Sequence, residues 1–212
     1  MNIGDMRTDY TRGELRREDL KPDPLQQFAL WLEDACRAGI VDPNAMSLAT
    51  ATAAARPSLR TVLLKQYDAR GFVFFTNLES RKARELTENP QVALLFPWVA
   101  LERQVIITGR AERVSTAEVL AYFVTRPLGS QLAAWASHQS SAITSRKILE
   151  MKWDEMKRKF SDGKVPLPSF WGGYRVIPAD IEFWQGRSNR LHDRFLYRRQ
   201  PDHIWQIEQL AP

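Results

Sequence analysis

Cysteine is nearly absent from this chain of 212 residues, in which Cys36 is the only one. A single cysteine excludes an intrachain disulfide and a cysteine-based metal cluster. Histidine is also sparse, because His138, His192 and His203 are scattered and lack any metal-ligand spacing. The sequence therefore predicts neither a disulfide framework nor a metal site.

Long apolar runs are missing as well. No stretch approaches the ~18 consecutive apolar residues of a membrane-spanning helix, so no membrane partner is expected. Asp5, Arg7 and Asp9 leave no apolar region for a secretory signal, and we expect a cytoplasmic protein. There is no Gly-x-Gly-x-x-Gly turn and no regular alternation of strands and helices, which argues against a Rossmann dinucleotide site.

The charge balance is moderately basic. The 30 basic and 25 acidic residues give a formal net charge of +5, which favours anionic partners without separating nucleic acid from phosphorylated small molecules. Because the basic residues occur in ones, twos and threes, we expect phosphate handling or simple solubility, and no nucleic-acid partner. The alternative, a non-enzymatic basic binding module, predicts a steep salt dependence of nucleic-acid binding.

The apolar pattern predicts a mainly β fold of the α+β class. Asp23 and Pro24 begin a helix, and further helices are expected at about 80–89, 115–126 and 145–160. Strands are expected at 46–52, 60–67, 71–76, 92–96, 103–114, 174–177, 181–185, 190–197 and 204–210. This order predicts one antiparallel split β-barrel domain over 23–212, with peripheral helices and a helical insert at about 115–160.

Residues 1–22 are polar and rich in charge. Such a segment is disordered alone or folds over a site when a ligand binds. Composition alone favours a solvated, mobile tail; the role of a substrate-covering segment is implied only by the family resemblance given below.

The clearest functional prediction concerns the helix that begins near residue 80. Ser80 is a natural N-cap, which places Arg81 and Lys82 in the first turn. Cations there oppose the helix dipole and cost a few tenths to ~1 kcal/mol. Free backbone N–H groups and two cations instead make a phosphate site. The alternative is a pair of solvated basic residues.

Two further groups of residues suit phosphate. Tyr122 and Arg126 lie four apart on the expected helix and so share a face, and Ser130 follows in a short loop. Two hydroxyls and a guanidinium that converge make a phosphate cradle. In the expected strand 60–67, alternation places Arg60 and Lys65 on opposite faces, so one cation could serve each of two adjacent ligands.

The stretch 184–194 passes through a polar loop centred on Gly186 and Asn189 and then extends through Arg190, His192 and Arg194. Alternate side chains of an extended segment share a face. Two guanidiniums that flank an imidazole suit an anionic, planar ligand. The alternative is an exposed edge strand whose charges are solvated.

These motifs together resemble the pyridoxamine 5′-phosphate oxidase family. The run Ile-Glu-Phe-Trp-Gln at 181–185, followed after four residues by Arg-Leu-His-Asp-Arg at 190–194, is similar to the C-terminal signature of the family. Tyr-x-x-x-Arg-Pro-x-x-Ser at 122–130 and Arg-x-x-Tyr at 7–10 are similar to further family motifs. The resemblance covers nearly the whole chain. It implies a flavin-binding split barrel that works as a homodimer, with flavin mononucleotide (FMN) at the subunit interface.

The resemblance also implies a role for each motif. Arg190 and His192 would orient the pyridine ring of the substrate, with Leu191 in the same site, and Arg7 and Tyr10 would close over it. The substrate phosphate would be held by Lys65, Tyr122, Arg126 and Ser130. FMN would be held by Arg60, Thr61, Val62, Leu63, Leu64, Lys65, Phe75, Thr76, Arg81, Lys82, Gln104, Gln139, Ser140, Trp184 and Arg194. Phe75 stands where family members often carry tyrosine, so a hydroxyl contact there would be absent.

The implied reaction is the oxidation of pyridoxamine 5′-phosphate or pyridoxine 5′-phosphate to pyridoxal 5′-phosphate. O2 would accept the electrons and become hydrogen peroxide, and the amine substrate would also release ammonia. A split-barrel flavin reductase is the alternative enzyme, but it lacks the substrate cradle. The sequence leaves open the preference for amine or alcohol, and whether Arg16 and Arg17 form a second ligand site.

Overall fold

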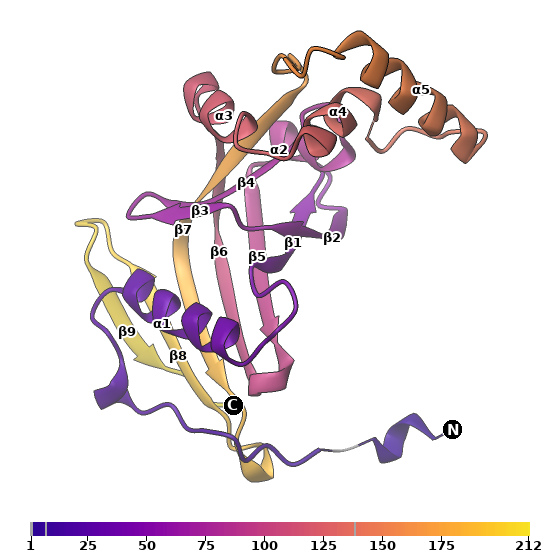
Figure 1. Ribbon diagram of the computed structural model, residues 1–212. Coiled ribbons are helices and arrows are strands. Elements are labelled where there is room, and N and C mark those ends of the chain that lie inside the picture. The colour runs from indigo at the N-terminus through magenta and orange to yellow at the C-terminus, as the bar shows by residue number, and fades with distance from the viewer. Residues whose placement is uncertain (1, 7, 138) are drawn as a thin grey trace.

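The computed structural model describes residues 2–6, 8–137 and 139–212 (Figure 1). The helices are α1 (Pro24–Arg37), α2 (Arg81–Glu88), α3 (Thr116–Phe123), α4 (Leu128–Ala136) and α5 (Arg146–Lys159), with 3-10 turns η1 (Ile3–Asp5), η2 (Arg17–Asp19), η3 (Val99–Leu101) and η4 (Ser188–Arg190). The strands are β1 (Ala45–Ala51), β2 (Pro57–Leu63), β3 (Gln66–Asp68), β4 (Gly71–Asn77), β5 (Gln91–Trp98), β6 (Arg103–Arg113), β7 (Trp171–Gln185), β8 (Asp193–Arg199) and β9 (Trp205–Gln209).

All of these strands belong to one antiparallel sheet. The main path runs β2-β1-β5-β6-β7-β4-β3, and β8 and β9 continue from β7. Strand β7 is the centre of the arrangement, because β6 pairs along its length while β4 pairs with its first part and β8 with its last part. The sheet thereby forms the split barrel that the sequence predicts, with helices on its periphery (Figure 1).

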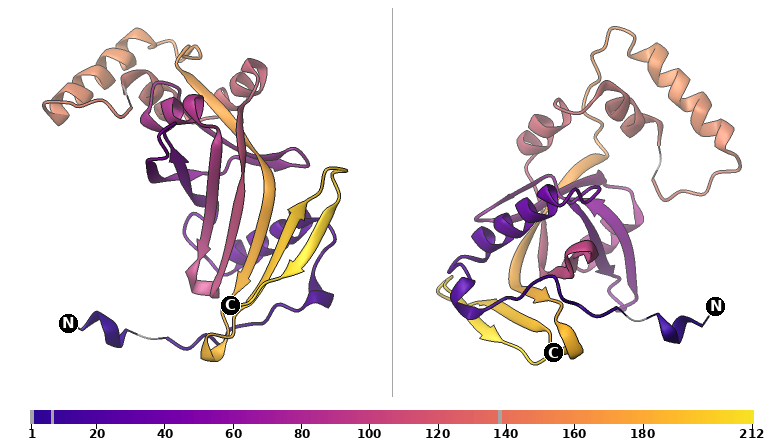
Figure 2. Two further views of the ribbon diagram at one scale, coloured as in Figure 1. Left: turned by 180° about the vertical axis from the view of Figure 1, so that it is seen from behind. Right: turned by 60° about the horizontal axis from the view of Figure 1, so that its bottom comes forward.

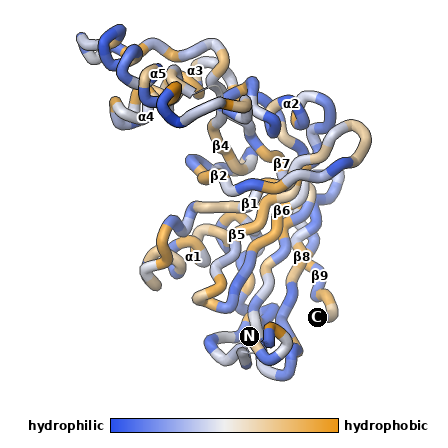
Figure 3. The backbone as a smooth tube through the Cα atoms, turned by 90° about the vertical axis from the view of Figure 1, so that its right-hand side faces the viewer, coloured by the Kyte–Doolittle hydropathy of each residue, from blue (hydrophilic) through white to orange (hydrophobic). Residues whose placement is uncertain are grey.

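Helix α1 covers the barrel and supplies much of its core. The Asp23 side chain accepts a hydrogen bond from the Leu25 N–H, and Pro24 occupies the first turn, as the sequence predicts. Phe28 is fully buried and its ring lies 5.0 Å from Phe96 and 5.1 Å from Phe72. Aromatic pairs in this geometry add ~0.5–1.5 kcal/mol each to the burial term. Strands β5 and β6 carry hydrophobic stretches (Figure 3), and both contribute residues to the buried core.

Several strand predictions need correction, and the first two concern how strands are divided. The expected strand 60–67 is divided into β2 and β3, because the chain leaves the β2 ladder at Leu64 and Lys65. The burial pattern of the expected strand still holds, since Arg60 and Val62 are half-buried and Thr61 and Leu63 are exposed. The expected strands 174–177 and 181–185 are one continuous strand, β7, which absorbs a register shift opposite Thr108 and Gly109.

The largest local error concerns the expected strand 190–197. Arg190 lies in the η4 turn, and its backbone is left-handed with φ of 60°. Strand β8 begins only at Asp193. Arg190 and His192 therefore do not alternate along an extended strand. The polar loop around Asn189, which is also left-handed at φ 56°, is longer than the sequence pattern indicates.

Helix α3 is also shorter than predicted. Its capping box is present, with the Ser115 side chain and Glu118 each accepting from the backbone of the other residue. The helix ends at Phe123, so Arg126 follows it rather than lying on it. Ser130 lies in the first turn of α4, not in a loop.

The two ends of the molecule carry different elements. Helices α3, α4 and α5 gather at one end, and the N-terminal residues and η4 lie at the other end (Figure 1, Figure 2). The N-terminal chain is tied to the sheet by hydrogen bonds from the Leu15 N–H to Asp193 (3.0 Å) and from the Tyr197 hydroxyl to the Lys21 carbonyl (2.7 Å). None of the helices in the described residues is long and apolar enough to span a bilayer.

Candidate functional site

A cavity of about 430 Å³ lies where β2 and β4 meet the helical end. Its walls come from segments far apart in the sequence. It is lined by Thr61, Val62, Leu63, Lys65, Phe75, Thr76, Asn77, Lys82, Tyr122, Arg126, Ala133, Ala134, Ser137, Gln139 and Trp171. The structure therefore brings together the predicted strand, helix-start and Tyr122–Arg126 motifs; we name this space the cationic cavity.

The charge of the cationic cavity has one sign. Lys65, Lys82 and Arg126 line it, and no carboxylate is among the described residues that do so. Three cations around a partly enclosed space attract anions strongly, because the protein around them lowers the effective dielectric constant. The cavity thus fits ligands that carry phosphate.

Lys82 is the most buried of these cations, with 8% of the residue exposed. It lies in the first turn of α2, whose N-cap is Ser80, as the sequence predicts. Its Nζ donates to Gln139 Oε1 (2.8 Å) and to Thr76 Oγ1 (3.2 Å). Burial, assisted by the charge of Arg60, lowers the pKa of Lys82 to about 8. An anionic ligand beside Lys82 would favour its protonated, charged form, which burial disfavours.

Arg126 lies at the aromatic side of the cavity. The rings of Phe75 and Tyr122 stack with their centroids 4.2 Å apart, and Trp171 lies 5.4 Å from Phe75. The Arg126 guanidinium lies over the Trp171 ring at 4.7 Å. Its Nη1 is buried and has no hydrogen-bond partner among the described residues. Burial lowers the pKa of Arg126, and an unpaired buried donor on a cation is the feature expected where an anion binds.

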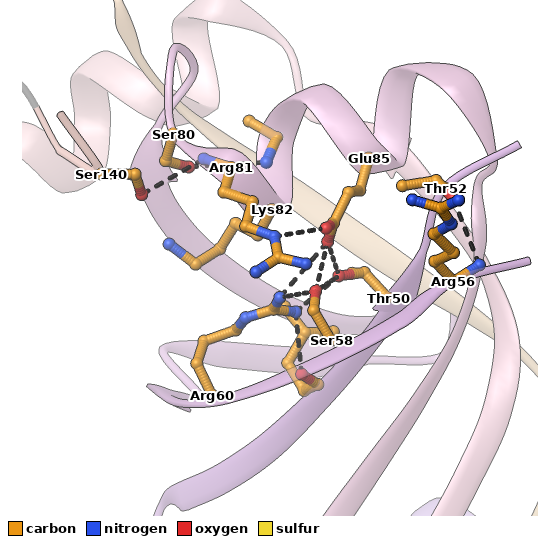
Figure 4. Close-up of polar contacts among 12 residues, drawn as sticks. Thr50, Thr52, Arg56, Ser58, Arg60, Ser80, Arg81, Lys82, Glu85 and Ser140 are labelled. Atoms are coloured by element: carbon orange, nitrogen blue, oxygen red, sulfur yellow. Dashed lines mark hydrogen bonds and ion pairs between the residues drawn. The ribbon is translucent and has the colours of Figure 1, made fainter. Parts of the chain in front are cut away.

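Arg60 and Arg81 do not line the cationic cavity. Both instead contact Glu85, a buried carboxylate one helical turn after Arg81 (Figure 4). Glu85 is not among the residues predicted from the sequence, although its four-residue spacing from Arg81 on a predicted helix is a recognisable ion-pair signal. Trp171 and Asn77 are not among them either, because the sequence offers no signal that they share a site.

A second cavity, of about 910 Å³, lies at the opposite end of the barrel. It is lined by Met6, Thr8, Asp9, Tyr10, Trp184, Arg187, Asn189, Arg190 and His192; we name it the η4 cavity. Arg190 and His192 therefore line the same cavity, even though the backbone between them is a turn. Leu191 is 69% exposed and does not line the cavity. Arg7 lies outside the described residues.

An aromatic cluster forms the floor of the η4 cavity. The Trp184 and His192 rings lie 4.6 Å apart, and Tyr10 lies 5.9 Å from Trp184 and 5.8 Å from His192. The Arg187 N–H donates to His192 Nδ1 (3.1 Å). Because Nδ1 accepts, the hydrogen of the neutral ring lies on Nε2. His192 thus presents its Nε2–H group as a hydrogen-bond donor.

The remaining predicted residues lie apart from both cavities. Arg194 forms an ion pair with Glu182 at 2.8 Å, which raises its pKa, and it also donates to the Ala211 carbonyl. Gln104 pairs with Trp184 between β6 and β7. Leu64 is buried in the core. Ser130 does not line the cationic cavity, and the Ser140 hydroxyl accepts from the Arg81 N–H beside it.

Within one chain, the residues predicted to form a single substrate site therefore lie in two separate cavities. Lys65, Tyr122 and Arg126 line the cationic cavity, whereas Arg190 and His192 line the η4 cavity. Helices α3 and α4 lie at one end of the molecule, and η4 and the N-terminal residues lie at the other end (Figure 1). The two cavities have no lining residue in common. No cluster of potential metal ligands occurs in the described ranges.

Family comparisons match both parts of the chain. The model described as pyridoxamine 5′-phosphate oxidase matches residues 32–160, and the pyridoxine 5′-phosphate oxidase C-terminal dimerisation region matches residues 171–212. Two curated relatives bear the name pyridoxine/pyridoxamine 5′-phosphate oxidase. The one from Rippkaea orientalis is 59% identical and covers 100% of both chains. The one from Edwardsiella ictaluri is 57% identical, over 100% of this chain and 97% of its own.

Solved structures give the same picture of the fold. PhzG from Burkholderia lata, in complex with tetrahydrophenazine-1-carboxylic acid, is 33% identical with a TM-score of 0.87, over 93% of this chain and 98% of its own. A pyridoxamine 5′-phosphate oxidase-related, FMN-binding protein from Nostoc punctiforme has a TM-score of 0.72 at 16% identity, over 90% of this chain and 98% of its own. The second likeness concerns the fold alone.

Proposed function

Since this chain belongs to the pyridoxamine 5′-phosphate oxidase family, we infer that it is an FMN-dependent oxidoreductase that converts pyridoxine 5′-phosphate and pyridoxamine 5′-phosphate to pyridoxal 5′-phosphate. The observation that carries this function is the cationic cavity, where three cations face a space that no described carboxylate enters. Both the cofactor and the substrates carry phosphate, so two anionic groups need compensation.

The residues around Lys82 fit the phosphate end of FMN. Lys82, Thr76 and Gln139 offer an ammonium, a hydroxyl and an amide at the start of α2, and Arg81 and Ser140 lie beside them. The backbone and side chains of 61–63 and Phe75 would line the rest of the cofactor. When bound, FMN supplies the redox chemistry by accepting a hydride from the substrate.

The aromatic side of the cavity fits the substrate phosphate. Arg126 would direct its unpaired Nη1 to a phosphate oxygen, and the Tyr122 hydroxyl and the Lys65 ammonium would complete the contacts. Ser130 precedes Ala134 of the cavity wall by four residues on α4, so it lies on the same helix face and is a further donor in this proposal.

The chain forms a homodimer, in accordance with its match to a dimerisation region. We propose that FMN lies at the subunit interface, where the η4 cavity of one subunit faces the cationic cavity of the other. Arg190 and His192 would then meet the substrate ring from the partner subunit, and Trp184 would contact the cofactor. The separation of the two cavities in one chain supports this arrangement, and Gln104 and Arg194 would reach the cofactor from the same side.

Within the η4 cavity, positioning is the main task of the protein. Arg190 would hold the substrate ring by charge, and the Nε2 hydrogen of His192 would donate to it. Residues 1–22 would form a substrate-covering segment over domain 23–212, with Tyr10 as the side chain that excludes water. Its ring already packs on Trp184 and His192.

The overall reaction balances with O2 as the acceptor. Pyridoxine 5′-phosphate and O2 give pyridoxal 5′-phosphate and hydrogen peroxide, and the amine substrate additionally consumes water and releases ammonia. We propose O2 as the physiological acceptor.

The function is tested with the purified chain. It should show the absorption bands of bound flavin near neutral pH, and the released cofactor should migrate as the mononucleotide. Under anaerobic conditions, pyridoxamine 5′-phosphate should bleach the bound flavin, and air should restore it with hydrogen peroxide as product. Bleaching by a reduced nicotinamide but not by the phosphorylated amine would instead identify a flavin reductase.

A further inference from the structure

A buried carboxylate lies beside the proposed phosphate end of FMN without lining the cavity. Only 4% of Glu85 is exposed. Its Oε2 accepts from the hydroxyls of Thr50 and Ser58 and from Arg60 Nη2, and its Oε1 accepts from Arg81 Nε at 2.8 Å. These donors come from β1, β2 and the first turn of α2 (Figure 4). Glu85 therefore joins three separate elements at one point.

The two arginines are held differently by this network. Arg60 is fixed throughout, because Nη1 also donates to the Leu48 carbonyl (3.0 Å) and to Thr50 Oγ1 (2.6 Å), and Nη2 donates to Ser58. Arg81 contacts Glu85 through Nε, and 61% of its side chain stays exposed. Its terminal guanidinium nitrogens are thus accessible to a ligand while its direction is set by Glu85.

Without Glu85 the three cations around this point would repel one another. Burial is the main cause that lowers the pKa of Arg60, and the positive charge of Arg81 lowers it further. The charge of Arg60 in turn adds to the effect of burial in lowering the pKa of Lys82. Burial alone would raise the pKa of Glu85, but hydrogen bonds from Ser58, Thr50 and Arg81 lower it to about 2. The carboxylate is therefore ionised at neutral pH.

The formal charges also match the ligand. Arg60, Arg81 and Lys82 with Glu85 leave two net positive charges, and the phosphate of FMN is largely a dianion above its second pKa near 6. The Lys82 ammonium donates instead to Thr76 and Gln139. The Glu85 carboxylate and the phosphate dianion of bound FMN would together neutralise the three cations.

We propose that Glu85 is a positioning residue for the cofactor phosphate, which holds Arg60 and Arg81 side by side at the start of α2 before FMN binds. This inference rests on the proposed FMN function. It assigns to Glu85 no contact with the ligand. Removing it should release the Arg81 guanidinium, whose side-chain contact is Glu85, and weaken binding, although the lost negative charge would by itself favour the phosphate.

A purely structural Glu85, which only ties α2 to β1 and β2, makes a different prediction. Loss of that tie would loosen the cavity for any flavin, with or without a phosphate. Riboflavin lacks the phosphate and carries the same ring. The ratio of the riboflavin Kd to the FMN Kd therefore reports on the phosphate contacts alone.

The experiment titrates the full chain, freed of flavin, with FMN and with riboflavin by quenching of flavin fluorescence. Glu85→Gln should raise the FMN Kd by tenfold or more, as expected for loss of a charge-assisted arrangement worth about a factor of ten to a hundred. The riboflavin Kd should change by less than about twofold. Glu85→Asp, which keeps the charge on a shorter side chain, should restore part of the affinity.

Glu88→Gln is the matched control, because Glu88 is exposed on the same helix and loses the same charge. It should leave both Kd values unchanged. Should Glu85→Gln fail to fold, Ser58→Ala removes one donor to the carboxylate and should still lower the ratio about threefold. Equal weakening of both flavins, an unchanged ratio or tighter FMN binding overturns the positioning role. A wild-type chain that binds neither flavin overturns the proposed function itself.

Discussion

Arg126 gives the sharpest test of the substrate site. Its guanidinium lies over Trp171 at 4.7 Å, and the buried Nη1 has no partner among the described residues. Arg126→Met keeps most of the apolar stem and removes the charge. In the proposed site this deletes at least one charge-assisted hydrogen bond to the substrate phosphate, worth ~1.5–3 kcal/mol. The KM for pyridoxamine 5′-phosphate should therefore rise roughly 10- to 150-fold.

The same substitution should hardly change stability. Burying an unsatisfied polar group costs ~1–3 kcal/mol, whereas a cation over an aromatic ring contributes ~0.5–2 kcal/mol. Because the variant loses both effects, its free energy of unfolding should stay within ~1 kcal/mol of wild type. A binding defect without a folding defect distinguishes a ligand-binding arginine from one that holds the structure together.

The assay is steady-state oxidation in air, with FMN content measured in the same preparation. Arg110→Met is the matched control, because Arg110 is an exposed arginine on β6 away from both cavities. It should leave KM and flavin content unchanged. An unaltered KM for Arg126→Met, or loss of FMN with KM intact, would refute the placement of the substrate phosphate.

Three further predictions concern the two cavities. The pKa of Lys82 near 8 predicts that FMN binds less tightly as the pH rises above 8, because the ammonium that attracts the phosphate loses its proton; titrations between pH 7 and 10 should show this slope, and Lys82→Met should abolish it. Arg190→Ala should lower kcat/KM on the order of 10²-fold with flavin occupancy intact, and His192→Ala should lower it less; wild-type rates of anaerobic flavin reduction in the Arg190→Ala variant would make this segment structural. Gly186→Ala places a methyl group 2.7 Å from Tyr10 Cδ2, so it should displace the ring and raise KM several-fold, and an unchanged KM would remove Tyr10 from the site.

Much of the fold follows from the sequence because its signals are local. The Asp23–Pro24 start of α1, the Ser80 N-cap of α2 and the capping box of α3 each depend on residues within one helical turn. The alternation of buried and exposed residues likewise identified most of the strands. The motifs of the site are also local, which is why the Tyr122 and Arg190 groups could be named in advance.

The errors arose where distant segments decide the local conformation. Strand β7 is continuous because β6, β4 and β8 supply partners along it, and no property of residues 178–180 alone reveals this. Arg190 adopts a left-handed backbone in the η4 turn, where the sequence pattern indicated an extended strand.

The sequence by itself determined which residues carry charge and hydroxyl groups, and in which short motifs. The tertiary structure decided how they are grouped. It placed Lys65, Lys82 and Arg126 around one cavity and Arg190 and His192 around another at the far end of the barrel. It also buried Glu85 between Arg60 and Arg81. Spacing along a chain fixes neighbours within a few residues, but contacts between separate strands and helices depend on how the sheet closes and packs.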